Sequence, residues 1–283
     1  MQTLGRRIIV AAFDGWNDAG EAATGAVRLL REERDPRPAF AVDPELYFDY
    51  QYTRPSVEAD GEGRRVLRWP DATLHRPGQG TGDVWFWTVT GSEPARAWRS
   101  FAGEFVDRAL AEDITGLVTL GSMMSDVPHT RPISVFASSE NAQVREELSL
   151  ERSTYEGPVG ILSVLGDAAE SAGIPTASLW ASVPHYVAGH TPSPKATLAL
   201  LTRLEELTGA AIPKGALPTE AAAWEATIDA AAADDEEMTD YIRQLEQTRD
   251  TWDSPEASGD AIARAFERYL DRDDPRDGRG DRR

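Results

Sequence analysis

The sequence predicts an α/β protein, organised as a three-layer α/β/α sandwich with a helical appendage at its C-terminal end. Short apolar runs typical of buried strands alternate with amphipathic stretches typical of helices. Hydrophobic residues make up 41% of the 283 residues, which is enough for a packed core. After residue 213 the chain becomes rich in Ala, Glu and Asp and its pattern is helical only. Such alternation of strands and helices is typical of a mostly parallel central sheet.

Strands are predicted where a short apolar run ends in turn residues. The first run, residues 8–13, is continuously apolar and ends at Asp14 and Gly15, as expected for a strand that is buried on both faces. Similar runs predict further strands at residues 39–42, 64–69, 84–89, 116–120, 133–136, 159–164 and 176–183.

Helices are predicted from capping residues and from apolar residues three or four positions apart. Asp18 is suited to cap a helix that starts just after it, with Glu21 in the position of a capping box. Further helices in the α/β part are expected at residues 95–110, near 166–172, and at 194–207, the last with Ser193 as N-cap, Pro194 as first residue and Gly209 beyond its end.

The chain is divided by its composition into three parts. Residues 1–213 carry the alternating pattern and are expected to form the α/β core domain. Residues 214–272 are expected to form the helical appendage, with one helix over 217–249 and a second over 260–270. Residues 273–283 are charged and lack apolar anchors, so we expect them to be disordered.

Composition excludes several functional classes. The formal net charge of −19 repels a phosphate backbone, and basic residues are scattered, so nucleic-acid binding is not expected. The absence of cysteine excludes disulfides, thiol catalysis and cysteine-ligated metals. No apolar stretch reaches the roughly 18 residues of a membrane helix, and the N-terminus lacks the pattern of a signal peptide. We therefore expect no membrane partner and a cytoplasmic location.

Polar residues follow three predicted strands, where ligand sites of α/β sheets usually lie. In this candidate rim, a histidine could titrate near neutral pH, an aspartate could orient it and an arginine could hold an anion. The alternative is structural: Asp18 caps a helix, Asp14 forms a turn, and each Pro-His pair marks a tight turn. The candidate binding residues are Asp14, Trp16, Asp18, Ser122, Met123, Asp126, His129, Arg131 and His185.

No complete catalytic, metal or cofactor motif accompanies these residues. Ser122 follows Gly121, but the G-x-S-x-G frame of a nucleophile elbow is missing. The histidines and Asp126 do not have the spacing of a metal-ligand motif. The Gly-rich residues 78–82 lack the Gly-Lys-Ser/Thr ending of a P-loop. We therefore assign no catalytic residue, no metal and no cofactor.

The aromatic residues suggest self-association. Residues 47–52 hold four aromatic side chains outside any clear periodicity, which favours a subunit interface. Trp16 and Trp180 flank the candidate rim, where they could line a pocket or an interface. The tryptophans in periodic apolar segments are expected in the core, namely Trp85, Trp87 and Trp98.

Several of these segments together resemble the PAC2 (proteasome assembly chaperone 2-like) family in its actinobacterial form. The resemblance covers nearly the whole α/β part. The stretches that carry it are Phe13 to Gly20, Leu120 to Met123 with Asp126 to Pro132, Tyr155 to Ile161, Ser178 to Val187 and Pro192 to Thr197; at the C-terminal end Ser258 to Ala261 and Phe266 to Leu270 match as well.

The resemblance implies a fold similar to nucleoside phosphorylases and related hydrolases, in a homo-oligomer for which a trimer is expected. It also implies kinship with proteasome assembly chaperones, which act through protein contacts. Some of these chaperones dock through a C-terminal tail of the hydrophobic–tyrosine–x type. This chain ends in Asp281-Arg282-Arg283, which argues against docking of that kind.

Two hypotheses follow. The first is a non-catalytic assembly protein with a protein partner; the alternative is a hydrolase or phosphorylase that uses His129 or His185 with Asp14 or Asp126. An enzyme should direct His129 and Asp126 into a cavity with Asp14, within reach of a common ligand. An assembly protein should have the same groups hydrogen-bonded to one another as turn formers.

Overall fold

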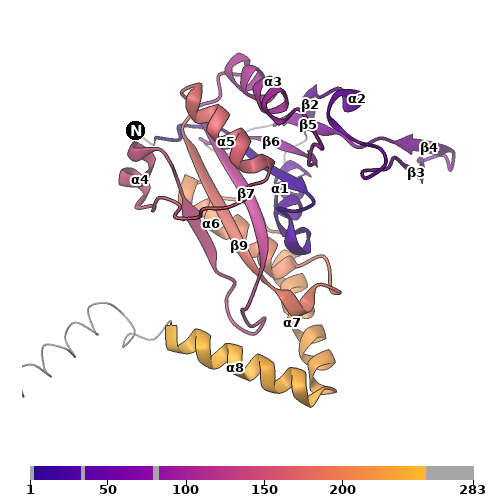
Figure 1. The fold of residues 1–283 in the computed structure, drawn as a ribbon, viewed down its shortest axis with the longest axis vertical. Coiled ribbons are helices and arrows are strands. Elements are labelled where there is room, and N and C mark those ends of the chain that lie inside the picture. The colour runs from indigo at the N-terminus through magenta and orange to yellow at the C-terminus, as the bar shows by residue number, and fades with distance from the viewer. Residues whose placement is uncertain (1–2, 33–35, 79–82, 253–283) are drawn as a thin grey trace, which may run out of the picture. The chain divides into compact units, whose positions relative to one another are not determined.

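The computed structural model describes residues 3–32, 36–78 and 83–252. Its main sheet has seven strands in the order β2-β5-β6-β1-β7-β9-β8 (Figure 1). The central strands are parallel: β6 (Trp85–Ser92), β1 (Arg7–Asp14), β7 (Gly116–Ser125) and β9 (Thr176–Pro184). The outer strands β2 (Arg37–Ala41), β5 (Ala72–Arg76) and β8 (Val135–Ser138) pair antiparallel. The predicted α/β class, with a mostly parallel centre, is confirmed.

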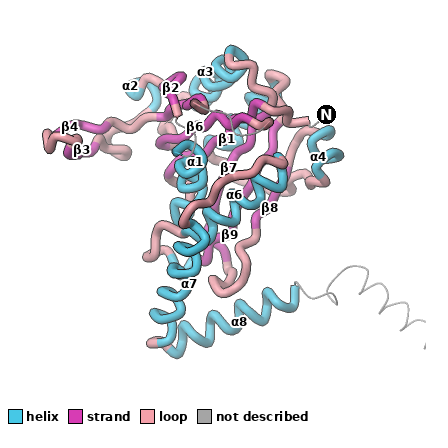
Figure 2. Tube along the Cα trace, turned by 180° about the vertical axis from the view of Figure 1, so that it is seen from behind, coloured by secondary structure: helices cyan, strands magenta, loops and turns pink. Residues whose placement is uncertain are grey.

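Helices cover both faces of this sheet, as the opposite views in Figures 1 and 2 show. Helices α1 (Ala22–Glu32) and α6 (Pro194–Thr208) pack against one face, and α3 (Trp98–Ala111) and α5 (Ile161–Ser171) against the other. Successive residues of β1 alternate between the two cores, with Val10 in one and Ala11 in the other. Because both faces of β1 are buried, its sequence is a continuous apolar run.

One local prediction is wrong, and two elements were not predicted. Residues 159–164 do not form a strand, because α5 begins at Ile161 after Gly160; the helix expected near 166–172 is the second half of α5. A short apolar run cannot by itself distinguish a strand from a buried helix. Strand β5 and helix α4 (Ala142–Leu148) were not predicted. Asn141 caps α4 by accepting hydrogen bonds from the backbone N–H groups of Gln143 and Val144 at 3.0 and 3.2 Å.

A two-stranded hairpin stands apart from the main sheet. It is formed by β3 (Ser56–Ala59) and β4 (Arg65–Arg68), which pair with each other and, in the described part of the chain, with no other strand. The strand predicted at 64–69 therefore exists, but outside the main sheet. The hairpin follows the short helix α2 (Pro44–Tyr47) and leads into β5.

The aromatic segment is mostly core, which corrects the prediction of an interface. Tyr47 and Phe48 are 2% and 1% exposed, and Tyr47 packs edge-on against Phe101. Burial and the hydrogen bond to Glu104 raise the pKa of Tyr47 to about 12. Tyr52, by contrast, is exposed.

The other tryptophans expected in the core differ in burial. Trp87 is buried as predicted, and Trp98 is half-buried with its indole N–H donating to the carbonyl of Pro94 at 2.6 Å. Trp85 is 39% exposed, so its predicted place in the core is wrong.

The described C-terminal residues form two helices instead of the single one predicted. These are α7 (Leu217–Ala233) and α8 (Glu236–Trp252). The chain divides into two compact units, and the first extends from Met1 to Ala230, beyond the boundary expected at residue 213. Leu217, Trp224 and Ile228 of α7 belong to its hydrophobic core. The helix expected at 260–270 and the tail at 273–283 lie outside the described residues.

No helix among the described residues is long and apolar enough to cross a membrane.

Candidate functional site

One buried residue, Asn17, links the end of β1 to β7 and to the segment that follows β6. The backbone carbonyl of Asn17 accepts a hydrogen bond from the N–H of Ser122 at 2.9 Å. The side-chain amide of Asn17 donates to Glu93 Oε1 at 3.0 Å. Glu93 Oε1 also accepts the N–H of Ile161 at 2.8 Å, at the start of α5. Gly160 lies so close that a Cβ there would be 2.2 Å from Asn17 Nδ2. Four segments of the chain are thus fixed at one point.

Asp18 and Ser122, two of the predicted rim residues, have structural roles here. Asp18 Oδ1 accepts the N–H groups of Ala23 and Thr24 at 2.8 and 3.2 Å, and Oδ2 accepts the Thr24 hydroxyl. It therefore caps α1, as predicted, although the 3-10 turn η1 (Ala19–Glu21) lies between them. Burial raises the pKa of Asp18, and the hydrogen bonds oppose this shift. Ser122 is fully buried, and its hydroxyl donates to the Ala19 carbonyl at 2.8 Å.

Apolar side chains are exposed immediately beside this buried junction. Trp16, Met123 and Val159 are each the sequence neighbour of a junction residue, and they are 64%, 39% and 46% exposed. Met124, the next residue of β7, and Tyr155, four residues before Val159, are exposed as well, at 44% and 63%. We call these five residues the rim patch.

Carboxylates flank the rim patch. Asp14, at the end of β1, accepts a hydrogen bond from the Ser92 hydroxyl at 3.1 Å. Burial raises the pKa of Asp14, and the charges of Asp18 and Glu93 raise it further. Glu156, next to Tyr155, is exposed. The surface therefore combines apolar contact area with negative charge.

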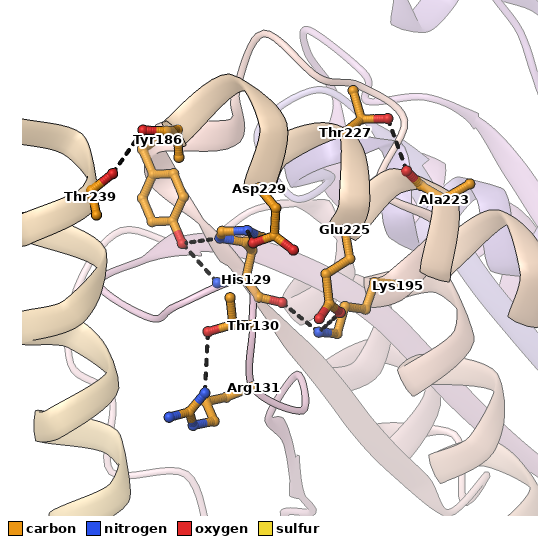
Figure 3. Close-up of polar contacts among 11 residues, drawn as sticks. His129, Thr130, Arg131, Tyr186, Lys195, Ala223, Glu225, Thr227, Asp229 and Thr239 are labelled. Carbon is orange, nitrogen blue, oxygen red and sulfur yellow. Dashed lines mark hydrogen bonds and ion pairs between the residues drawn. The ribbon is translucent and has the colours of Figure 1, made fainter. Parts of the chain in front are cut away.

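His129 is buried in a separate network (Figure 3). The Tyr186 hydroxyl accepts the backbone N–H of His129 at 2.7 Å and lies 2.8 Å from Nδ1. Nε2 lies 3.0 Å from Asp229 Oδ1 on α7. With Tyr186 donating to Nδ1, the neutral ring donates from Nε2 to the carboxylate, so both nitrogens are satisfied.

The backbone of His129 is held as well. Its carbonyl accepts from Lys195 Nζ, and Lys195 in turn pairs with Glu225 of α7. Burial lowers the pKa of His129, although the hydrogen bond to Asp229 acts to raise it. The network thus ties the loop after β7 to α6, to α7 and to the 3-10 turn η2 (His185–Val187).

The remaining candidates do not converge with His129. Asp126 Oδ1 pairs with His185 Nδ1 at 3.2 Å; the Asp126 side chain is largely exposed and the His185 ring partly exposed. Arg131 Nη1 donates to the Thr130 hydroxyl at 3.4 Å. The expectation that His129 and Asp126 share a cavity with Asp14 is therefore not met. The geometry of His129 is that of a turn former with its hydrogen bonds satisfied.

Sequence reasoning missed the partners of both clusters. Glu225 and Asp229 lie four residues apart on one helix, directly after Trp224 and Ile228, and this spacing on one face was the available signal. The composition of this segment predicts a separate appendage instead. No sequence motif marks Asn17 or Glu93 as partners in the buried junction.

No metal site is found at the rim within the described residues, and the cleft beside α6 lies away from it. Among the described residues no group of three or more His, Asp or Glu side chains could hold a metal ion. A cleft of about 390 Å³ lies between α6 and the segment that leads into β8, and it is lined by none of the nine candidate rim residues.

Fold and site together define an α/β sandwich protein whose conspicuous polar rim residues largely support structure, while apolar residues are exposed beside them. The chain belongs to the PAC2 family, whose model matches residues 12–232. No curated protein sequence matches it.

Solved structures of related proteins agree with this membership. A PAC2 family protein from Streptomyces avermitilis is 42% identical, with a TM-score of 0.75, covering 83% of this chain and 99% of that one. The proteasome-assembly chaperone homologue Rv2125 of Mycobacterium tuberculosis is 38% identical, with the same TM-score and coverage. A protein of unknown function from Corynebacterium glutamicum shares the fold: it is 24% identical over 88% of this chain and 92% of that one, with a TM-score of 0.78.

Proposed function

We propose that this chain is a non-catalytic assembly protein of chaperone type that binds other protein chains through the rim patch. We further propose that it acts in the cytoplasm as a homo-oligomer, for which a trimer is expected. The similarity to nucleoside phosphorylases is retained only as an expectation from the family resemblance.

One observation carries this proposal: three of the candidate polar groups, Ser122, Asp18 and His129, are buried and occupied by hydrogen bonds, while apolar groups near them in the sequence are exposed. The polar side-chain atoms of Ser122, Asp18 and His129 form hydrogen bonds within the fold. Trp16 and Tyr155 present large aromatic surfaces to solvent. Contiguous exposed apolar surface is typical of protein-interaction sites. The hydrolase or phosphorylase alternative is correspondingly not favoured.

Kinship suggests which proteins could be bound. The Mycobacterium tuberculosis relative is described as a proteasome-assembly chaperone homologue. We therefore propose proteasome subunits of the same organism as clients. The rim patch is the surface proposed to hold them.

Replacing Trp16 by Asp is expected to weaken client binding at least about tenfold. Interface tryptophans commonly contribute 2 kcal/mol or more, and 1.4 kcal/mol corresponds to a factor of ten. The measurement is a titration of the purified chain with purified proteasome subunits, followed by size-exclusion chromatography with light scattering. Trp252→Asp is the control, because Trp252 is also highly exposed but lies outside the first unit. Equal binding by Trp16→Asp and the parent, or no binding by the parent, would contradict the proposal.

A further inference from the structure

The β3–β4 hairpin is a well-formed arm. Asp60 Oδ1 accepts the N–H groups of Glu62 and Arg64, both at 2.9 Å, and closes the turn. Gly63 adopts a positive φ of 78°, which favours glycine. Figures 1 and 2 both show the hairpin extending away from the main sheet on its β2–β5 side.

The arm has two chemically different faces. Val57 and Leu67 are directly opposed across the strands, and they are 49% and 58% exposed. Because side chains alternate along a strand, Glu58 and Arg68 lie on the other face, where they form an ion pair at 3.2 Å. Trp69, two residues beyond Leu67, is 47% exposed and packs against Tyr50 at the base of the arm.

The apolar face of the arm needs a partner. An isolated two-stranded hairpin is at best marginally stable in water, since it has no core of its own. Here the larger apolar side chains of the pair face solvent, while its opposite face carries charges. Packing the Val57–Leu67 face against another surface would bury this area and hold the arm in place.

Charge indicates which surface that is. Arg65 lies on the apolar face opposite Ala59, and Arg54 precedes the arm; neither forms an ion pair within residues 3–32, 36–78 and 83–252. The rim patch is apolar as well, but it is flanked by the carboxylates of Asp14 and Glu156. Both surfaces are thus apolar, with arginines at the arm face and carboxylates beside the rim patch.

We propose that the arm of one copy docks, by its Val57–Leu67 face, on the rim patch of a second copy. This inference rests on the proposed function, because it takes the rim patch as a protein-contact surface and names what occupies it in the isolated protein. Such a contact joins two different surfaces, so repetition closes into a ring when the rotation between copies permits it. A client that binds the rim patch then competes with the arm.

Two adjacent residues give a matched test of the arm. Val57→Asp places a carboxylate on the apolar face, whereas Ser56→Asp places the same group on the opposite, exposed face. Light scattering of the full chain at micromolar concentration should give a multiple of 30.9 kDa for the parent and for Ser56→Asp. Val57→Asp should give a monomer. A monomeric parent, or an unchanged mass for Val57→Asp, would overturn the inference.

Mixing two defective variants tests whether arm and rim meet. Val57→Asp keeps an intact rim patch, and Trp16→Asp keeps an intact arm, so each should be monomeric alone. Their mixture retains one good contact and should form a species of about twice 30.9 kDa. Monomers only in the mixture would show that these two surfaces do not meet.

The same variants separate this inference from the proposed function. Val57→Asp frees the rim patch, so it should bind proteasome subunits at least as well as the parent. Trp16→Asp should lose both self-association and client binding. Normal client binding with an unchanged mass for Val57→Asp would reject the arm contact alone, whereas self-association without any client binding would reject the proposed clients alone.

Discussion

A chain that ends at residue 213 is expected to lose the cooperative unfolding transition of the first unit. Truncation there removes Leu217, Trp224 and Ile228, which are 5%, 9% and 4% exposed in the hydrophobic core. Burying one large apolar side chain contributes about 1.5–3 kcal/mol, so the three together contribute roughly 5–9 kcal/mol. The total stability of a domain is only about 5–15 kcal/mol.

Polar losses add to this effect. Without α7 the carbonyl of His190 loses the indole N–H of Trp224, which lies at 2.9 Å. Buried His129 loses Asp229, and Lys195 loses Glu225. A buried polar group left unpaired costs about 1–3 kcal/mol.

A chain that ends at residue 233 is the matched control. It keeps every residue of the first unit and the whole of α7, and it should melt cooperatively near the temperature of the full chain. Thermal melts followed by circular dichroism compare the three chains. If the chain ending at 213 melted like the full chain, the helices would be a separable layer, as the change of composition suggested.

The parts of the fold that could be predicted are those fixed by local chemistry. The run at residues 8–13 became β1 because burial on both faces requires apolar residues throughout. Helix α6 was predicted almost to the residue, because Pro194 marks its start and Gly209, with φ of 67°, marks its end.

The parts that could not be predicted depend on partners distant in sequence. In α7, alanines and acidic residues surround the few large apolar side chains, so the composition suggested an appendage. Leu217, Trp224 and Ile228 nevertheless enter the core. For the rim, the sequence predicted which loops follow the strands but not which side chains contact one another. His129 and its partner Asp229 are 100 residues apart, and no local pattern links them.

Replacing His129 by Ala is expected to lower the free energy of unfolding by about 1–3 kcal/mol. The ring is 1% exposed, and its removal leaves the Tyr186 hydroxyl and the Asp229 carboxylate without this partner. For a unit of this size, 1 kcal/mol corresponds to a shift of roughly 2–4 °C in the melting temperature. His185→Ala is the control: its ring is partly exposed and pairs with exposed Asp126, so the expected change is within about 0.5 kcal/mol.

The same side chain should make stability depend on pH in a defined direction. Burial lowers the pKa of His129 below its ordinary value of 6.5, although Asp229 and Glu225 oppose the shift and Lys195 supports it. As pH falls below 6.5 the unfolded chain binds the proton first, so the free energy of unfolding should decrease down to the lowered pKa and then level off. The raised pKa values of Asp14 and Asp18 act oppositely at lower pH, because the folded chain takes up those protons first.

Comparing the parent with His129→Ala isolates the contribution of this histidine, because Asp14 and Asp18 are common to both. Denaturant unfolding should be measured from pH 7 downwards. The difference in free energy of unfolding between parent and variant should narrow as pH falls from 6.5 to the lowered pKa of His129, since the variant has no imidazole to protonate at this position. A histidine that served as a catalytic base would instead be dispensable for folding. A variant as stable as the parent at pH 7 would therefore contradict the structural role and revive the enzyme hypothesis.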